Sequence, residues 1–374
     1  MERLYLDHAA TSYPKAPGVA QAAARFLEAP AGNAGRGVHA EATRAADALA
    51  HARRGLAELV GARPERMALV PGATFALNAL LQGSLTAGER VIVGPEAHTS
   101  VLRPLRLVGC EVVEVASDDL LRWDLEDLRR LLGEPTRAVV VSHGSNVTGV
   151  VQDLAAIVEL AHAVGTRVFV DGAQTVGALP LDVEALELDA LAFSGHKGLL
   201  GPTGTGGLYL RDGLELRPWI SGGSGSKSHD EAPPRAFPDA LEVGTKNAWA
   251  FATLVPALEW IAAQTPAALH ARAAELGAAL RAGLQQLPGV TLHAGAADHD
   301  LAVVSFTAAG WRPPELAVTL DALGVALRAG LHCAPRAHRR LGTLPDGTLR
   351  VSAGPFTRPD DVDEFLARLG SILV

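Results

Sequence analysis

The sequence predicts an α/β fold with a large unit built on a mostly parallel sheet and a smaller α/β unit after it. Between about residues 67 and 210, short runs rich in valine alternate with stretches of helical periodicity. Runs that are apolar at every position are typical of parallel strands that helices cover on both faces. After Pro288 the alternation continues with shorter elements, and a chain of 374 residues is long enough for two domains.

The individual elements follow from these patterns in chain order. We expect strands at residues 3–6, 67–70, 90–93, 111–115, 138–142, 167–170, 191–193 and 207–210, with helices at 17–27, 40–60, 75–82, 125–132 and 153–164. A helical region rich in alanine and leucine covers 248–287, followed by strands at 289–293, 301–306, 326–328 and 348–352 and helices at 313–323 and 359–371. The glycine-rich stretches 31–39 and 221–235 indicate loops. We place the large domain at 16–250 and the small domain at 1–15 and 251–374.

Composition limits the classes of protein to consider. Hydrophobic residues make up 48% of the chain and charged residues 20%, which is typical of a soluble globular protein. A net charge of -8 gives no reason to expect nucleic acid or an anionic membrane as a partner. Only Cys110 and Cys333 are present, no apolar run is long enough to span a membrane, and no signal peptide is expected. We therefore expect a cytoplasmic protein.

Polar residues that directly follow predicted strands mark a candidate site. Lys197 lies between two apolar runs, and His98, Asn146 and Asp171 each come just after a strand. In parallel sheets, ligands bind beyond the carboxyl ends of the strands. A lysine between apolar runs is either reactive or at a buried turn, although a surface hairpin with a solvated lysine is equally compatible with these residues alone.

One lysine, one carboxylate, one histidine and donors suited to a phosphate are what a pyridoxal-phosphate enzyme requires. Eight motifs occur in order along the chain: L-D-H-A-A-T-S-Y-P-K, N-A-G-R-G-V-H, S-N-V-T-G, V-D-G-A-Q, S-G-H-K, E-V-G-T, R-A-G-L-H-C-A-P and L-R-V-S-A-G. With them the chain resembles aminotransferase class V, a family of fold-type I pyridoxal-phosphate enzymes, and most closely its cysteine desulfurase branch near SufS. The resemblance implies a large domain with a mostly parallel, seven-stranded type of sheet and a smaller C-terminal α/β domain.

The same resemblance assigns the residues around the cofactor. Lys197 would bond covalently to pyridoxal 5'-phosphate, Asp171 would keep the pyridine nitrogen protonated, and Gln174 would bind the ring phenolate. His98 would stack on the ring and shuttle protons. The phosphate would be held by Ala73, Thr74, Ser194 and His196, and by Thr245 from the other subunit of a homodimer. No metal is expected.

The substrate and reaction follow from the remaining motifs. By resemblance, Asn146 and Arg350 would bind the substrate carboxylate. Arginine suits this task because its planar guanidinium can donate two parallel hydrogen bonds to a carboxylate. Cys333 would take the sulfur of L-cysteine as a persulfide, leaving L-alanine, with His332 a candidate for tuning the thiol and Cys110 an inert packing residue.

The predicted function is thus a cysteine desulfurase that hands sulfur to an acceptor protein for iron–sulfur cluster assembly. Two alternatives stay open. One is a selenocysteine lyase or another class V aminotransferase or lyase. The other is a catalytically idle scaffold in cluster assembly.

Overall fold

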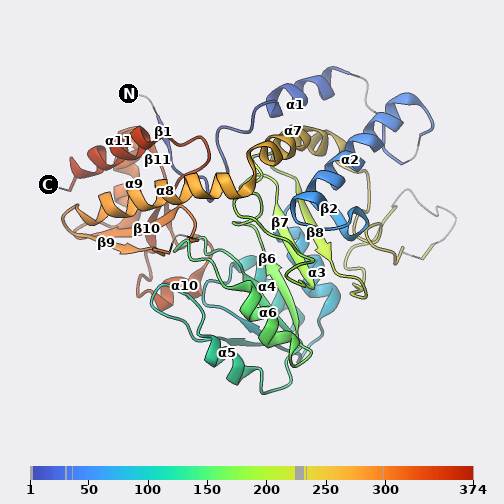
Figure 1. Cartoon of the computed structure of the whole chain (residues 1–374), viewed down its shortest axis with the longest axis horizontal. Helices are drawn as coiled ribbons and strands as arrows, with labels where there is room; N and C mark the ends of the chain where they lie inside the picture. Colours follow the sequence, from blue (N-terminus) through green and yellow to red (C-terminus); the bar gives the residue numbers. More distant parts are fainter. Residues whose placement is uncertain are drawn as a thin grey trace.

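The computed structural model describes residues 3–29, 32–35, 37–223, 231–232, 234–297 and 299–373. Its strands form sheets of seven, four and two strands, which Figure 1 shows with helices packed around them. Most of the predicted loop 221–235 and parts of the loop 31–39 lie outside the described residues. Among the residues described, no helix has the length and apolar character needed to cross a membrane.

The seven-stranded sheet is mostly parallel, as predicted. Its order is β2 (Met67–Val70), β8 (Gly206–Leu210), β7 (Ala190–Ser194), β6 (Arg167–Asp171), β5 (Ala138–Ser142), β3 (Arg90–Val93) and β4 (Glu111–Glu114). Only β8 runs antiparallel to its neighbours. Helices cover both faces, so every strand of this sheet is almost entirely buried except β4 at one edge, which is half-buried to exposed.

Successive residues of these strands contribute to two separate cores. Met67 and Leu69 pack into one layer and Ala68 and Val70 into the other, as the two-residue period of a strand requires. The first layer contains α1 (Val19–Glu28), α2 (Ala40–Leu59), α5 (Leu125–Leu131), α6 (Leu154–His162) and α7 (Ala248–Gln264). The second contains α3 (Ala73–Ser84) and α4 (Thr99–Val108). The sequence did not predict α4, which contains Pro104.

The four-stranded sheet is antiparallel and forms the smaller unit. Its order is β12 (Arg328–Gly330), β13 (Thr348–Ser352), β10 (Val303–Ala308) and β9 (Val290–His293). It shares a core with α8 (Pro266–Gln285), α9 (Pro313–Ala322) and α11 (Pro359–Gly370). The short helices η1 (Pro64–Arg66) and α10 (Pro335–Arg340) complete the chain, and α10 was not predicted.

The chain between 325 and 330 differs from its prediction. Instead of one strand at 326–328 there are β11 (Val325–Ala326) and β12, which belong to different sheets. β11 pairs in parallel with β1 (Leu4–Tyr5), so the N-terminal segment joins the smaller unit. Three residues are too few for a period to show where one strand ends and the next begins.

The predicted domain boundary near residue 250 falls at the start of a helix. α7 packs on α1 and α2, and its buried face belongs to the core of the seven-stranded sheet. α7 ends just before Thr265. The next helix, α8, begins at Pro266 and runs towards the four-stranded sheet (Figure 1). The domain limits 16–250, 1–15 and 251–374 therefore remain a prediction that would cut α7 near its first turn.

Candidate active site

A cavity of about 230 Å³ lies at the carboxyl ends of the central strands. Its walls include all the predicted site residues except Thr245, Cys333 and Arg350. Those present are Ala73, Thr74, His98, Asn146, Asp171, Gln174, Ser194, His196 and Lys197. Side chains that are more than a hundred positions apart in sequence meet here because parallel strands end at one edge of the sheet.

Lys197 follows β7 in a tight turn that leads to β8. Its side chain is half-buried, and burial lowers the pKa of its ammonium to about 8, with Arg350 adding to the effect and Asp171 opposing it. A lysine with such a pKa is partly neutral near pH 7 and can act as a nucleophile. The alternative of a solvated hairpin lysine does not describe this site.

Asp171 ends β6 and is almost completely buried on the cavity wall. Its Oδ1 accepts a hydrogen bond of 3.0 Å from the backbone N–H of Ala173, which fixes the carboxylate at the strand end. Gln174 lies one turn further, where its Nε2 donates to the carbonyl oxygen of Ala9 over 3.0 Å. The carboxylate and the amide thus both face the space beside Lys197.

His98 is the N-cap of α4 and therefore has a structural role as well. Its Nδ1 accepts from the backbone N–H of Ser100 over 3.0 Å, and the Ser100 hydroxyl lies 2.8 Å from that of Thr74. Burial lowers the pKa of His98, so the ring is neutral and, with Nδ1 accepting, carries its proton on Nε2. The N-termini of α3 and α4 are joined through this contact.

The start of α3 has the character of an anion site. Gly72 precedes it with φ 156°, a backbone conformation that favours glycine, and the Ala73 N–H donates to Ser194 Oγ over 2.9 Å. Thr74 is exposed in the first turn, where a helix presents unpaired N–H groups and a positive dipole end. Burial lowers the pKa of His196 to about 4, so this residue of the wall is neutral.

Arg350 reaches the site from β13 of the other sheet. It is 1% exposed, and its Nη2 donates to Asp7 over 2.9 Å while Nη1 donates to the Asn146 carbonyl oxygen over 3.0 Å. Its Nε has no partner among the described residues. Arg350 thus does not line the cavity itself but contacts the backbone of Asn146, which does.

Cys333 is exposed in the short loop between β12 and α10, whose neighbouring residues His332 and Ala334 are buried. Its carbonyl oxygen accepts from the Thr99 N–H over 2.8 Å, which attaches the loop to the start of α4 directly beside His98. Asn146 Nδ2 donates to the carbonyl oxygen of the preceding residue, His332, over 2.6 Å. Two hydrogen bonds therefore hold the backbone of the cysteine loop against the cavity wall.

The environment of His332 does not support the predicted role of tuning the Cys333 thiol. Its ring is buried, its Nε2 lies 3.1 Å from Thr348 Oγ1, and burial together with Arg350 lowers its pKa to about 2. A neutral ring cannot stabilise a thiolate by charge. Cys110 is half-buried beside β4, where burial raises the pKa of its thiol, and it does not line the cavity.

Thr245 is exposed and is not part of the cavity wall. The segment that carries it is anchored by Glu242, whose buried carboxylate accepts from Arg53, Lys246 and the Leu69 N–H. A role for Thr245 in a second subunit's site remains a prediction.

Glu96, which the sequence patterns did not identify as a site residue, is 1% exposed on the cavity wall. Trp123 Nε1 donates to both of its carboxyl oxygens over 3.0 Å, and a Cβ on Gly94 would collide with both groups. Burial raises the pKa of Glu96 to about 8, which leaves it an uncharged acid at pH 7. Its position two residues before His98, just after a strand end, was the available signal in the sequence.

Ser142 also lies on the cavity wall. Its buried Oγ has no partner in the described part of the chain, as expected where a ligand binds.

The family model for aminotransferase class V matches residues 4–365. A probable cysteine desulfurase of Mycolicibacterium paratuberculosis is 34% identical over 97% of this chain, which spans only 54% of that relative's length. Cysteine desulfurase CsdA of Escherichia coli is also 34% identical, over 96% of this chain and 91% of its own.

Solved structures show the same similarity. An apo cysteine desulfurase from Thermococcus onnurineus NA1 has a TM-score of 0.92 at 27% identity and covers 99% of this chain and 94% of its own. For E. coli CsdA the TM-score is 0.88 at 32% identity, with 100% and 96% covered. A C-DES mutant with glycine covalently linked to its PLP cofactor has a TM-score of 0.83 at 25% identity, with 98% and 96% covered. The predicted fold type is confirmed, and the chain belongs to the aminotransferase class V family.

Proposed function

We propose that this protein is a pyridoxal-phosphate-dependent cysteine desulfurase that converts L-cysteine to L-alanine and keeps the sulfur as a persulfide on Cys333. One observation carries the proposal: an exposed thiol stands on a loop bonded to the start of α4, beside a cavity that contains a lysine of lowered pKa and a buried aspartate. The relatives' names support the same activity. Neither the selenocysteine lyase nor the idle scaffold is favoured by any observation.

The residues of the cavity fit the cofactor. Lys197 would hold its aldehyde carbon, Asp171 its ring nitrogen and Gln174 its phenolic oxygen, while the start of α3 with Thr74, Ser194 and His196 would hold its phosphate. Pyridoxal phosphate, when bound, supplies an electron sink for the substrate's α-carbon. The Ser142 hydroxyl, which has no partner among the described residues, and the N-terminus of α3 are features that a polar, anionic ligand would satisfy.

Proton transfer falls to Lys197 and His98. Because the pKa of Lys197 is about 8, its Nζ can release and take up protons near neutral pH. His98 lines the cavity and is neutral, and because its Nδ1 accepts from the Ser100 N–H its proton lies on Nε2. Asn146, on the cavity wall, and Arg350, whose Nη1 donates to the Asn146 carbonyl oxygen, would bind the substrate carboxylate.

Cys333 performs the sulfur transfer. Its thiolate attacks the sulfur of the substrate, an S–S bond forms, and the substrate's C–S bond breaks with its electron pair staying on carbon. A proton then joins that carbon to give alanine. In sum, L-cysteine and the Cys333 thiol become L-alanine and a Cys333 persulfide, and no outside oxidant is needed.

The wider role follows from the same chemistry. A persulfide on an exposed loop suits transfer to an acceptor protein, and iron–sulfur cluster assembly in the cytoplasm is the process we propose for it. We also propose a homodimer in which Thr245 of each subunit reaches the other's phosphate site, since Thr245 is exposed and is not part of its own cavity wall. Loss of cofactor affinity in Thr245→Ala, with an unchanged dimer in sedimentation, tests that part.

The decisive experiment is mass spectrometry of the cofactor-loaded protein after treatment with L-cysteine. We expect one added sulfur on the peptide that contains Cys333, and none on that of Cys110. Cys333→Ala should abolish both the adduct and alanine release, whereas Cys110→Ala, the matched control, should retain both. Unchanged alanine release from Cys333→Ala would refute the persulfide role.

A further inference from the structure

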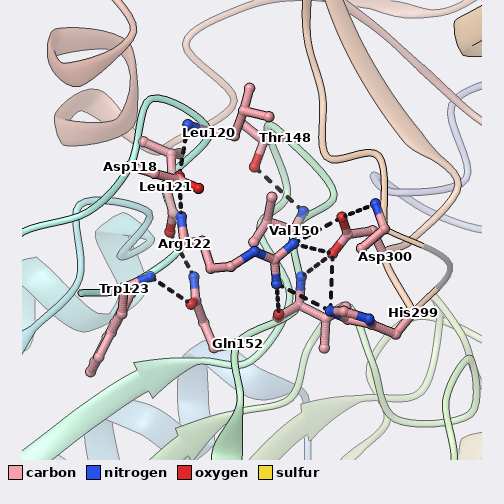
Figure 2. Close-up of polar contacts among 12 residues, drawn as sticks. Asp118, Leu120, Leu121, Arg122, Trp123, Thr148, Val150, Gln152, His299 and Asp300 are labelled. Carbon is pink, nitrogen blue, oxygen red and sulfur yellow. Dashed lines mark hydrogen bonds and ion pairs between the residues drawn. The ribbon is translucent and has the colours of Figure 1, made fainter. Parts of the chain in front are cut away.

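Residues 117–123, between β4 and α5, form a compact loop that contacts three other parts of the molecule. We call this segment the Arg122 loop. Figure 2 shows its polar contacts. Asp118 Oδ1 accepts from the backbone N–H groups of Leu120 and Arg122 over 2.9 and 2.8 Å. From outside, Gln152 donates to the Leu121 carbonyl oxygen over 2.7 Å and accepts from the Trp123 N–H over 3.1 Å.

These bonds hold Leu121 in an unusual conformation. Its φ of 76° lies in the left-handed region, which a branched side chain rarely adopts, and its side chain is fully buried. Strained backbone of this kind persists only where its surroundings fix it, and it is concentrated at functional sites. His332 and Cys333, with φ of 47° and 60°, share the conformation.

The first contact of the loop is with the chain that follows Cys333. Leu121 packs with Val147, Ala334 and Ala337 in a small apolar cluster of its own. Ala334 is the residue after Cys333, and Ala337 lies in α10. On the outside of the same helix, Arg340 donates to the Ser117 carbonyl oxygen over 3.1 Å and pairs with Asp119. The loop thus contacts the segment after Cys333 both through this apolar cluster and through the polar contacts of Arg340.

The second contact joins the loop to the smaller unit. Arg122 Nη2 donates to both oxygens of Asp300, each over 3.1 Å, and Nη1 donates to the Val151 carbonyl oxygen over 3.0 Å (Figure 2). The Asp300 carboxylate is completely buried and also accepts from the N–H groups of Val151 and Ala297. Because one arginine and two backbone amides bind this buried carboxylate, they fix the position of Asp300 relative to the Arg122 loop.

The third contact reaches the cavity. Trp123, the last residue of the loop, bonds through Nε1 to Glu96 on the cavity wall. One short segment therefore touches the cavity wall, the smaller unit and the base of the Cys333 loop.

We propose that the Arg122 loop is a positioning element for Cys333, with Leu121 as the residue that fixes the chain directly after Cys333 through its packing on Ala334 and Ala337. This rests on the proposed function. Hydrogen bonds from the Thr99 N–H and from the Asn146 side chain hold the backbone of the cysteine loop at two points, and packing in the Leu121 cluster holds the residue after Cys333. Without that support Cys333 departs from the sulfur it must attack, while the cavity that holds Lys197 and Asp171 keeps its shape.

A comparison of L-cysteine and L-selenocysteine as substrates distinguishes misplacement of Cys333 from general damage to the active site. Desulfuration of L-cysteine needs the thiol. From L-selenocysteine, selenium can leave as the element, with the electron pair of the C–Se bond staying on carbon and the selenol proton moving there. Both give alanine, so one assay measures both, and Cys333→Ala sets the scale: cysteine turnover lost, selenocysteine turnover kept.

In Leu121→Ala we expect kcat for cysteine to fall about tenfold or more with KM within about twofold, since misplacement of a reacting group by a fraction of an ångström is sufficient. Selenocysteine turnover and the visible absorbance of the bound cofactor should stay near those of the wild type. Leu121→Met should restore most of the cysteine activity because it conserves volume. Leu120→Ala, in the same loop but outside the cluster, is the matched control and should resemble the wild type.

Parallel loss of both activities in Leu121→Ala, or loss of neither, overturns the proposal. If that variant binds no cofactor, Arg340→Gln decides instead, because it removes only surface contacts to Ser117 and Asp119. A fall of about two- to threefold confined to cysteine supports the proposal, and its absence overturns it. Should Cys333→Ala itself turn over cysteine normally, the proposed function fails whatever the loop variants do.

Discussion

The cavity and the Cys333 loop differ in how their residues are held. The cavity residues lie at the ends of buried parallel strands or at helix N-termini, where the sheet itself fixes them. Cys333 is exposed, in a left-handed backbone, and is held by bonds from α4 and Asn146 and by packing on the Arg122 loop. The cavity can therefore bind and activate a substrate without the cysteine loop, whereas the thiol depends on contacts from both sheets.

The largest effect tests the cavity. Lys197→Ala removes the only group we place at the cofactor's aldehyde, so cysteine turnover should fall by about 10⁴ or more. Borohydride treatment should fix the cofactor to the wild-type protein and not to the variant, as mass spectrometry of the protein can show. Covalent fixation in the variant would mean that another lysine holds the cofactor.

Arg350→Lys tests the residue that connects the smaller unit to the cavity wall through Asn146. A lysine can replace the charge but not the parallel donors that reach Asp7, Asn146 and a substrate carboxylate. We expect kcat/KM for cysteine to fall by about 10², mostly through KM. The cofactor's absorbance before substrate is added should not change; if it does, Arg350 contributes to cofactor binding instead.

Thr99→Pro tests the backbone bond that holds the cysteine loop. Proline is well accepted at the first position of a helix, and His98 already has the extended backbone that precedes proline. The substitution removes the N–H that donates to the Cys333 carbonyl oxygen and puts a methylene in its place. We expect cysteine turnover to fall about tenfold, with selenocysteine turnover unchanged. Thr99→Ala keeps the N–H and should resemble the wild type; equal losses in the two variants would exclude the backbone bond as the cause.

Glu96→Gln has the smallest expected effect on cysteine turnover, because glutamine keeps the uncharged state that the buried acid has at pH 7. The pKa of Glu96 is raised from 4.5 to about 8 in the folded protein, so the folded state holds a proton that the unfolded state releases. Its contribution to stability is complete below pH 4.5 and is lost as pH rises through about 8, by about 1.4 kcal/mol per pH unit between these values. Glutamine has no such loss. Urea unfolding at pH 5 and pH 8 should show the variant gaining stability over the wild type at the higher pH, and a gain that does not depend on pH would show that Glu96 is ionised throughout.

Prediction from sequence succeeded for elements with a clear hydrophobic period and for residues that directly follow a strand. The Val-rich runs identified the strands of the large sheet, and the residues after them proved to line one cavity. It failed for α10 and for β11 and β12, because these elements are too short to show a period. Glu96 was missed because its burial arises from Trp123, a residue 27 positions away.

The sequence alone determined the fold class, the family and which residues follow the strand ends to line the cavity, since periodicity, strand-end position and motif order are local properties of the chain. Only the tertiary structure decided the states and distances of those groups. Burial lowers the pKa of Lys197 and raises that of Glu96, and the meeting of two sheets places Cys333 beside His98. Burial and long-range contact are made by residues far apart in the chain, and no local pattern records them.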